Sequence, residues 1–392
     1  MTEVANIFRE FGPGYRHAHK LTRHMHKVMN AIERCRTSAL GGHVDECTNC
    51  GHKRISYNSC RNRHCPKCQG MAREKWLLNR EKDLLPVGYF HLVFTIPNDL
   101  NVLALQNQKI LYNLLFKASS EALIELGRER KYLGAEIGHI SILHTWGQNL
   151  MDHPHIHSIV PAGGLALDGK RWIHARKNFL IPIRVISRVY RGKFMAYFKE
   201  ACRKGRIQFE GQLKRLTNSN ELKSLIDCLY KKEWVVYCKE PFDNPMKVME
   251  YLGRYTHRVA ISNDRIVKVE NTKVSFKWKD YADQSKNKVM SINGEEFIRR
   301  FLLHVLPLNF VKIRHYGILS NRSRKIKLKK CQDILEVNRD SLETKALSWK
   351  ELLLKVKGID IEICPICCQG KMTRKERITP RAYSPPKDFI VA

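Results

Sequence analysis

Two Cys-x2-Cys pairs near the start of the chain constrain its folding more than any other feature. Cys47 and Cys50 form the first pair, and Cys65 and Cys68 form the second after fourteen intervening residues. Each pair closes a tight turn that points two thiolates at one ion, and this spacing is typical of zinc ribbons and knuckles. A segment this short cannot bury a sufficient hydrophobic core. Bound zinc would stabilise it instead. We therefore predict a structural Zn²⁺ held by these four cysteines.

Further cysteines leave the number of zinc ions open. The chain has 13 cysteines, and without a signal peptide we expect metal binding rather than disulfides. Cys364-x2-Cys367, followed by Cys368, is half of a knuckle whose partners are not evident nearby, with Cys331 as one candidate. The candidate ligands for a further zinc are Cys35, Cys60, His64, Cys364 and Cys367.

The charge of the chain points to a polyanionic partner. Lys and Arg number 70 and Asp and Glu 38, which gives a net charge of +32. Nucleic acid is the polyanion that best fits, because each neutralised phosphate also releases a counterion. We expect no transmembrane helix, because no apolar run is long enough. We therefore expect a bacterial-type protein that is cytoplasmic and associated with the nucleoid.

The pentapeptide His153-Pro154-His155-Ile156-His157 is the most informative motif. Alternate residues of a strand share a face, so His155 and His157 lie side by side while Ile156 points into the core. Two such imidazoles can chelate one divalent ion and leave positions open for water and a phosphate oxygen. For the third ligand we favour His144 on the preceding strand, with Gln148 as the alternative. We expect Pro154 to break the strand between His153 and the pair.

Two tyrosines form a second constellation. Tyr251 and Tyr255 are four residues apart, so on a helix they share one face. Basic residues surround them, including Arg254 and Arg258. A phenol has a pKa near 10, so a tyrosine nucleophile needs a basic surround or a metal-bound phosphate to lose its proton.

Hydrophobic periodicity gives a mixed set of elements. We predict helices over 14–34, 71–84, 100–131, 184–204, 219–231, 244–256 and 294–306, and strands over 90–97, 138–147, 155–164, 234–238 and 260–281. Asp168-Gly169 signals a hairpin turn.

The nearby sequence from Gly164 to Lys170 resembles a phosphate-binding loop. Arg171, however, stands at the position where such a loop has the Ser or Thr that binds magnesium. We therefore expect that the protein binds no nucleotide.

Taken together, these motifs resemble a known family. HPHIH (153–157) resembles the histidine motif of HUH endonucleases, and FTIP (94–97) resembles their first motif. YLGRYTHRVAIS (251–262) resembles the twin-tyrosine motif of rolling-circle transposases of the insertion-sequence ninety-one family, and SYNSCRNRHCPKCQ (56–69) resembles their zinc-binding domain. The likeness covers about residues 15–320, and the motifs occur in the family's order.

The resemblance implies both a fold and a reaction. The implied fold is α+β: a central antiparallel sheet with flanking helices, preceded by a small zinc-binding domain. Tyr251 and Tyr255 would be the nucleophiles, and His155, His157 and His144 would bind catalytic Mg²⁺ or Mn²⁺. A tyrosine would attack single-stranded DNA at transposon ends, keep the 5′ phosphate and free a 3′-OH, and the joined target would also be single-stranded DNA.

Three consecutive domains follow from this interpretation. They are a helix with a zinc-binding, DNA-contacting module (1–85), a tyrosine transposase domain (86–320) and a basic extension with a cysteine knuckle (321–392). We expect DNA contacts from the basic run 322–330 and from individual arginines. These arginines are Arg61, Arg63, Arg254, Arg258 and Arg314.

Alternative functions and further partners remain open. The alternatives are an HUH-type replication initiator and a non-catalytic, zinc-dependent DNA-binding regulator. Without an ATPase motif, we expect a host helicase or replication proteins to expose single strands.

Overall fold

The structure, a computed structural model, divides the chain into two compact units. It describes residues 2–176, 180–242, 247–248, 253, 259–280, 283–337 and 347–380. The zinc unit comprises Met1–Trp76, His257–Val305 and Thr344–Ala392, and the sheet unit comprises Leu77–Thr256 and Leu306–Glu343. The domains predicted at 1–85, 86–320 and 321–392 follow one another along the chain, whereas each compact unit collects segments that are distant in sequence.

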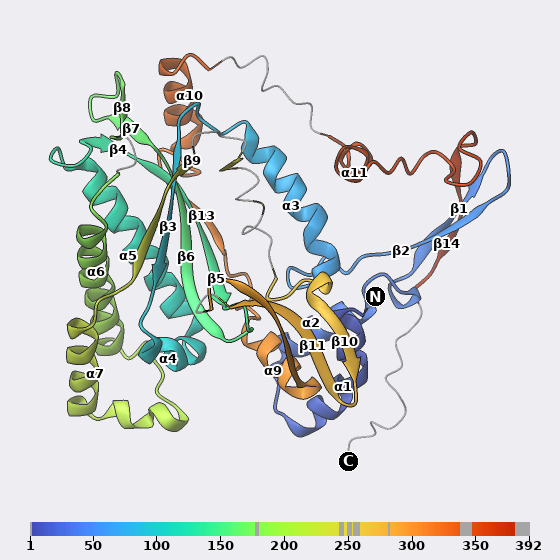
Figure 1. Cartoon of the computed structure of the whole chain (residues 1–392), viewed down its shortest axis with the longest axis horizontal. Coiled ribbons are helices and arrows are strands. Elements are labelled where there is room, and N and C mark those ends of the chain that lie inside the picture. Colours follow the sequence, from blue (N-terminus) through green and yellow to red (C-terminus); the bar gives the residue numbers. More distant parts are fainter. Residues whose placement is uncertain are drawn as a thin grey trace. The chain divides into compact units, whose positions relative to one another are not determined.

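A five-stranded sheet in the order β13-β5-β6-β3-β9 forms the centre of the sheet unit, and its neighbouring strands are antiparallel. The strands are β3 (Tyr89–Thr95), β5 (Gly138–Trp146), β6 (Asp152–Pro161), β9 (Val236–Phe242) and β13 (Ile313–Gly317). Helices α5 (Gln108–Arg128) and α6 (Ile183–Arg203) lie along one face of this sheet (Figure 1). The predicted fold class, an antiparallel sheet with flanking helices and a cysteine-rich module, is confirmed.

Strand alternation divides the sheet into an apolar and a polar face. Phe90, Leu92 and Phe94 of β3 are buried in the core beneath the helices. Tyr190 of α6 packs edge-on against Phe94, with ring centroids 5.2 Å apart, and its hydroxyl donates to the carbonyl oxygen of Thr95. The intervening residues of β3, including His91, therefore belong to the opposite face.

The remaining elements of the sheet unit surround this core. They are α4 (Asn101–Gln106), α7 (Ser219–Lys231), α10 (Arg324–Ile334) and a small sheet of β4 (Ala135–Glu136), β7 (Gly163–Ala166) and β8 (Trp172–His174). The short 3-10 helices are η2 (Asn98–Leu100) and η3 (Gly211–Thr217). Gly169 has φ +70° between β7 and β8, and the Asp168 side chain accepts from the Lys170 amide, so the predicted hairpin turn is confirmed.

Three helices and a three-stranded sheet form the body of the zinc unit. They are α1 (Val4–Ala18), α2 (Arg23–Arg34), α9 (Gly294–Leu303), β10 (Ile266–Glu270), β11 (Lys273–Asp280) and β12 (Lys286–Asn293). Short 3-10 helices are η1 (Ser38–Leu40) and η4 (Asn263–Arg265), and α11 (Trp349–Lys357) is a further helix. Helix α3 (Pro66–Glu81) begins in this unit, and its residues from Leu77 on belong to the sheet unit. Phe8 of α1 packs edge-on against Phe301 of α9, with centroids 5.1 Å apart, so distant segments share one core.

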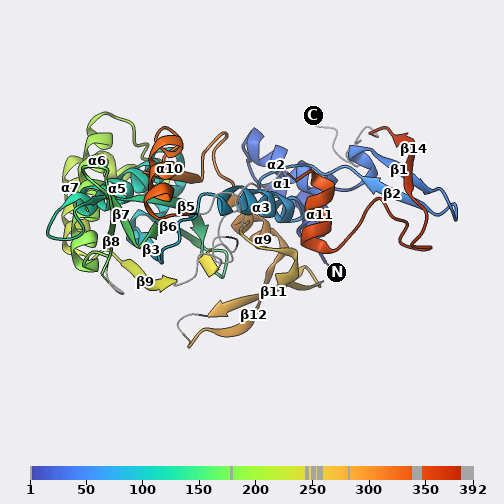
Figure 2. The same cartoon turned by 90° about the horizontal axis from the view of Figure 1, so that it is seen from above.

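A second sheet of the zinc unit joins the beginning of the chain to its later part. Strand β1 (Gly42–Cys47) lies between β2 (Lys53–Tyr57) and β14 (Met372–Ile378), and both pairings are antiparallel. Figure 2 shows β14 running beside β1 and β2. We call these three strands and the cysteine turns at their ends the ribbon.

Local signals explain where the predictions succeeded and failed. The helix predicted over 219–231 is confirmed as α7, because the Asn218 side chain accepts from the amides of Asn220 and Glu221 and begins the helix there. The single helix predicted over 14–34 is wrong. Thr22 instead begins a separate helix, α2, by accepting from the Met25 amide.

The strand break predicted at Pro154 is also wrong, since β6 continues from Asp152 to Pro161. The register of β6 with β5 shifts beside this residue, and its pairing with β3 ends at His155. A proline has no amide hydrogen, so a position outside the regular ladder tolerates it. Among the described residues, no helix combines the length and hydropathy that crossing a bilayer requires.

Candidate functional site

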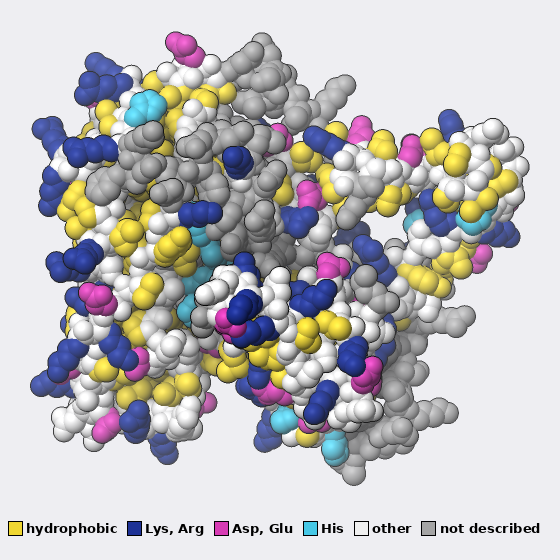
Figure 3. Space-filling model, viewed as in Figure 1, with side chains coloured by type: hydrophobic (Ala, Val, Ile, Leu, Met, Phe, Trp, Pro, Cys, Tyr) yellow, Lys and Arg dark blue, Asp and Glu magenta, His cyan; other side chains and the backbone are white. Residues whose placement is uncertain are grey.

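Three histidines meet on the polar face of the central sheet. His144 of β5 is paired directly with His155 of β6, and His157 is the next residue of β6 on that face. Their ligand atoms all lie within 4.8 Å of one another. The structure thus brings together His155, His157 and His144, which the sequence proposed as a metal-binding set. Figure 3 shows histidine side chains as a strip over this part of the sheet.

The geometry of the histidine cluster suits a metal ion. The Nε2 atoms of His155 and His157 are 3.0 Å apart. Ligands about 2.1 Å from an ion are about 3.0 Å apart at neighbouring octahedral positions and about 3.4 Å apart in a tetrahedron. The observed spacing therefore fits two neighbouring positions of an octahedral ion.

Burial keeps these imidazoles in the form that binds metals. All three side chains are at least nine-tenths buried. Burial lowers the pKa of His155 to about 4, and the neighbouring His153 contributes a smaller effect in the same direction. At neutral pH His155 is therefore uncharged, as metal coordination requires.

A fourth histidine, His91 of β3, supports the cluster from the neighbouring strand. Its Nε2 lies 2.8 Å from Nδ1 of His157, and the two rings are stacked. Burial, followed by the charge of Lys239, lowers the pKa of His91 to about 3. The contact fixes the ring of His157 with its Nε2 toward His155. His91 was not among the residues predicted from the sequence, although an isolated histidine in an apolar strand was a visible signal.

His153 and the alternative ligand Gln148 lie beside the cluster. His153 is outside the group of three, but its carbonyl oxygen accepts a hydrogen bond from Nδ1 of His155 at 2.6 Å. This bond turns Nε2 of His155 toward His157. Gln148, the alternative third ligand, lies in the turn between β5 and β6.

The proposed nucleophiles Tyr251 and Tyr255 lie outside the described residues, as do Arg254 and Arg258. The nearest described residue before them is Val248, which is helical and fully buried. Val248 lines a small cavity together with Ile140 and Ile159 of the central sheet. Ile140 and Ile159 are paired and share the face that carries the histidine cluster.

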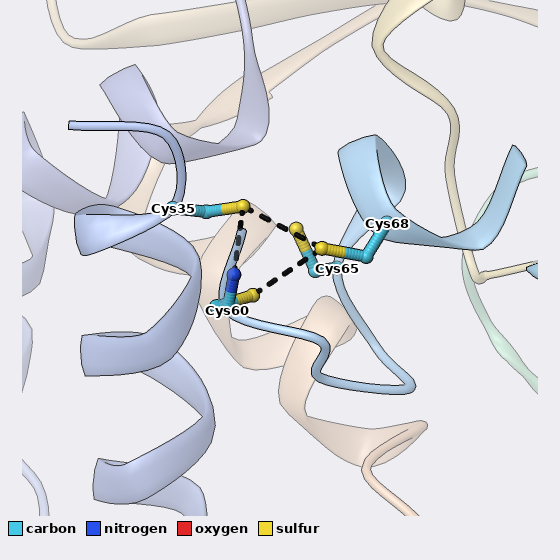
Figure 4. Close-up of side chains that lie close together, drawn as sticks. All are labelled: Cys35, Cys60, Cys65 and Cys68. Atoms are coloured by element: carbon cyan, nitrogen blue, oxygen red, sulfur yellow. Dashed lines mark hydrogen bonds between the residues drawn. The ribbon is translucent and has the colours of Figure 1, made fainter. Parts of the chain in front are cut away.

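Cys35, Cys60, Cys65 and Cys68 converge in the zinc unit, as Figure 4 shows. Cys35 follows α2, Cys60 follows β2, and the other two flank the start of α3. The Sγ atom of Cys68 is 3.5 Å from that of Cys35 and 3.6 Å from that of Cys60. Sulfurs about 2.3 Å from one zinc ion are about 3.8 Å apart in a tetrahedron, whereas a disulfide requires about 2.05 Å. We call this group the first cysteine cluster.

The electrostatics of the first cysteine cluster favour a bound cation. Hydrogen bonds shared with Cys35, Cys60 and Cys65 lower the pKa of the Cys68 thiol far below its usual value. Further thiolates at this spacing repel one another unless a cation lies between them. Four crowded sulfurs are the ligand set typical of structural zinc.

The predicted grouping of Cys47, Cys50, Cys65 and Cys68 around one ion is wrong. Cys65 and Cys68 join Cys35 and Cys60, whereas Cys47 and Cys50 join Cys364 and Cys367. The reason is the β1–β2 hairpin, because β1 carries Cys47 to the far end of the ribbon and β2 returns to Cys60. We call the group of Cys47, Cys50, Cys364 and Cys367 the second cysteine cluster.

Two further candidates for zinc binding are placed elsewhere. His64 lies outside both clusters, and its Nδ1 is 3.2 Å from Oδ1 of Asn62. Cys331, suggested as a partner of Cys364, is buried within α10.

The arginines proposed to bind DNA differ in their surroundings. Arg61 is exposed, whereas Arg63 is partly buried, and burial lowers its pKa. Arg314 stacks on Phe116, 4.1 Å from the ring centroid, and donates to Oδ1 of Asn113. These contacts engage the guanidinium on the helix-covered side of the sheet, so Arg314 has a packing role there, and its contact with DNA stays a prediction.

Comparison with known proteins identifies the family. A model described as "Transposase zinc-binding domain" matches residues 7–96, and one described as "Putative transposase" matches residues 138–327. "Putative transposase y4qJ" of Sinorhizobium fredii is 48% identical over 373 residues, which are 94% of each chain. "Transposase for insertion sequence element IS801" of Pseudomonas savastanoi is 28% identical over 291 residues, 74% of this chain and 68% of the relative. The chain belongs to the insertion-sequence ninety-one family of transposases.

Membership of this family assigns the chain a DNA-processing role. The zinc-binding match contains all of the first cysteine cluster, which supports structural zinc there. The transposase match contains all three residues of the histidine cluster. Comparison with solved structures gives no match.

Proposed function

We propose that this transposase cuts single-stranded DNA with a tyrosine and moves its element by a rolling-circle route. One observation carries the proposal: three buried imidazoles converge within 4.8 Å on the polar face of the sheet. Mg²⁺ or Mn²⁺ bound by His144, His155 and His157 would polarise the scissile phosphate. The contacts from His91 and His153 hold two of these rings in their orientations.

The position of Val248 supports the tyrosines as nucleophiles. Tyr251 and Tyr255 follow Val248 by three and seven positions, a spacing that puts side chains on one face of an α-helix. Val248 is buried against the sheet face that carries the histidine cluster. In the helix that the sequence predicts over 244–256, both tyrosines would share a face with Val248 and so lie toward the same side of the sheet.

The proposed reaction conserves the number of phosphodiester bonds. The phenolate oxygen of a tyrosine attacks phosphorus and forms a 5′-phosphotyrosine, while the bond to the 3′ oxygen breaks and that oxygen gains a proton. Attack by a 3′-OH on the phosphotyrosine reverses these changes and joins two strands without ATP. The second tyrosine would permit a second cut at the other element end.

The protein's charge and its relatives support the choice of substrate and process. The net charge of +32 suits a DNA backbone at element ends and at the target. A host helicase or replication proteins would supply single strands. The relatives are named as transposases, which favours transposition over replication initiation. A regulator without catalysis would leave the histidine cluster without a role.

The test is the formation of a covalent adduct. Purified protein is incubated with labelled single-stranded element ends and Mn²⁺, and the products are separated on a denaturing gel. We expect an adduct that disappears in the Tyr251→Phe, Tyr255→Phe double variant. Tyr237→Phe is the control, because Tyr237 is an exposed tyrosine on β9, the edge strand of the same sheet beside β3.

The control also identifies the outcome that defeats the proposal. An adduct that survives the double variant but disappears in Tyr237→Phe would assign the nucleophile elsewhere. His155→Ala combined with His157→Ala should abolish cleavage but retain most DNA binding, since affinity comes mainly from Lys and Arg. His153→Ala leaves the three ligands intact and should retain cleavage.

A further inference from the structure

We propose that the second cysteine cluster binds its own structural zinc ion, separate from that of the first cluster. Cys47 ends β1 and Cys50 lies in the turn after it, whereas Cys364 and Cys367 come from the turn before β14. The matched zinc-binding domain ends at residue 96, so it contains only half of this ligand set. The site is independent of the proposed tyrosine chemistry.

The sulfur positions fit a tetrahedral zinc site. Sγ of Cys47 is 3.6 Å from Sγ of Cys367, and Sγ of Cys50 is 3.7 Å from Sγ of Cys364. A tetrahedral ion with zinc–sulfur bonds of about 2.3 Å requires sulfurs about 3.8 Å apart. A disulfide bond is about 2.05 Å long, so these spacings fit ligands around one ion and not a disulfide.

Backbone amides point at the ligand sulfurs from both turns. The amides of Asn49 and Cys50 donate to Sγ of Cys47, and the amide of Gly370 donates to Sγ of Cys367. Such bonds stabilise the thiolate, the form that binds metal.

Gly370 allows the two turns to approach each other. A Cβ atom at this position would lie 2.3 Å from Sγ of Cys47 and 2.9 Å from the amide nitrogen of Asn49. Any side chain there would therefore displace a ligand. The turns also bond directly, since the Thr48 amide donates to the Lys371 carbonyl and the Lys371 amide donates to Oγ1 of Thr48.

The ribbon lacks an apolar core that could hold it together without metal. Four of its large apolar side chains are exposed, with Ile55 at 56%, Tyr57 at 40%, Ile363 at 43% and Ile366 at 67%. Val44, Met372 and Ile378 are only partly buried. The ligands Cys47 and Cys364, by contrast, are buried. The best-buried side chains of the ribbon are therefore two of the proposed metal ligands. This arrangement is typical of a small fold that zinc stabilises.

The test counts zinc and measures thiol protection in the full-length protein. Metal analysis of the wild type should give two zinc ions per chain. During brief iodoacetamide labelling followed by peptide mass spectrometry, Cys364 and Cys367 should be protected. The adjacent Cys368 is exposed and lies outside the cluster, so it should react and serve as the internal control.

Variants then assign each ion to its site. Cys364→Ser combined with Cys367→Ser should reduce the zinc content to one, whereas Cys368→Ser should leave two. Gly370→Ala, which removes no ligand, should also lose one zinc. If the wild type holds one zinc and Cys364 and Cys367 react as fast as Cys368, the proposal is wrong. Iron in place of zinc in the second cluster would also overturn it.

Discussion

Nε2 of His91 lies 2.8 Å from Nδ1 of His157, so a ligand of the proposed catalytic metal is held by a histidine from the neighbouring strand. Groups that hold a metal ligand commonly change metal affinity about 10- to 100-fold when they are removed. The His91→Phe variant keeps an aromatic ring but loses the nitrogen. We expect the Mn²⁺ concentration that gives half-maximal adduct formation to be about 10-fold higher, or more, in the variant than in the wild type. An unchanged Mn²⁺ dependence would show that His91 only fills space.

Buried histidines should make the sheet unit sensitive to acid. Burial lowers the pKa of His139 to about 3 and, with smaller effects from Arg80 and Arg324, that of His315 to about 4. In the unfolded chain these pKa values return to about 6.5. As pH falls from about 6.5 toward 4, the unfolded chain gains protons that the native state does not bind, so the free energy of unfolding decreases. Burial raises the pKa of Asp152 to about 7, which acts in the opposite sense, but the histidines outnumber it.

His139→Phe tests this pH dependence. Neither ring nitrogen of His139 has a hydrogen-bond partner in the described part of the chain, and the ring stacks on Tyr316. Phenylalanine keeps the stacking and removes one group that titrates only in the unfolded state. Urea unfolding at pH 7 and pH 5 should show a smaller loss of stability than in the wild type. The exposed His174→Gln should match the wild type, and equal losses in all three proteins would contradict the prediction.

Gly317 should tolerate no side chain. Its φ is +57°, and a Cβ atom would lie 1.8 Å from the carbonyl oxygen of Ile137. Because this contact involves backbone, Gly317→Ala should destabilise the sheet unit by several kcal/mol, on the order of the larger effects of single substitutions. Gly192 lies within α6, and a Cβ atom added there would have no neighbour within 4 Å, so Gly192→Ala should stabilise the same unit by about 0.5–1 kcal/mol. Thermal unfolding of both variants would measure the contrast.

Substitution of Arg314 should mainly lower stability, whereas substitution of Arg322 should mainly weaken DNA binding. Arg314 is engaged by Phe116 and Asn113, so Arg314→Ala should cost about 1 kcal/mol or more of stability and leave DNA affinity nearly unchanged. Arg322 is exposed in the basic run, so Arg322→Ala should instead weaken DNA binding and reduce its salt dependence. Fluorescence anisotropy at several salt concentrations and urea unfolding measure the two effects. The reverse pattern would place Arg314 at the DNA interface.

The sequence predicted the histidine cluster because its residues are local. His155 and His157 are adjacent on one strand face, and a short turn brings the preceding strand with His144 beside them. Strand periodicity alone places such residues together. His91 could be noticed as a lone histidine in an apolar strand, but its contact with His157 depends on the pairing of β3 with β6, which connects residues 66 positions apart.

The cysteine clusters were mispredicted for the opposite reason. Nearest-neighbour spacing groups Cys47 and Cys50 with Cys65 and Cys68, but strand β14 supplies a closer pair from far along the chain. Spacing cannot encode a partner that arrives by tertiary pairing. The break at Thr22 was missed because the apolar periodicity continues across it, although threonine is a good helix-beginning residue.

The pairing of β1 with β14 has a consequence for synthesis of the protein. Cys50 and Cys364 are separated by 314 positions, so a ribosome adding about 5–20 residues per second needs tens of seconds between them. Throughout that interval the nascent ribbon has half of its ligands and two of its three strands. A prematurely terminated copy of the enzyme would never complete this module, so assembly of the ribbon distinguishes finished translation products from truncated ones.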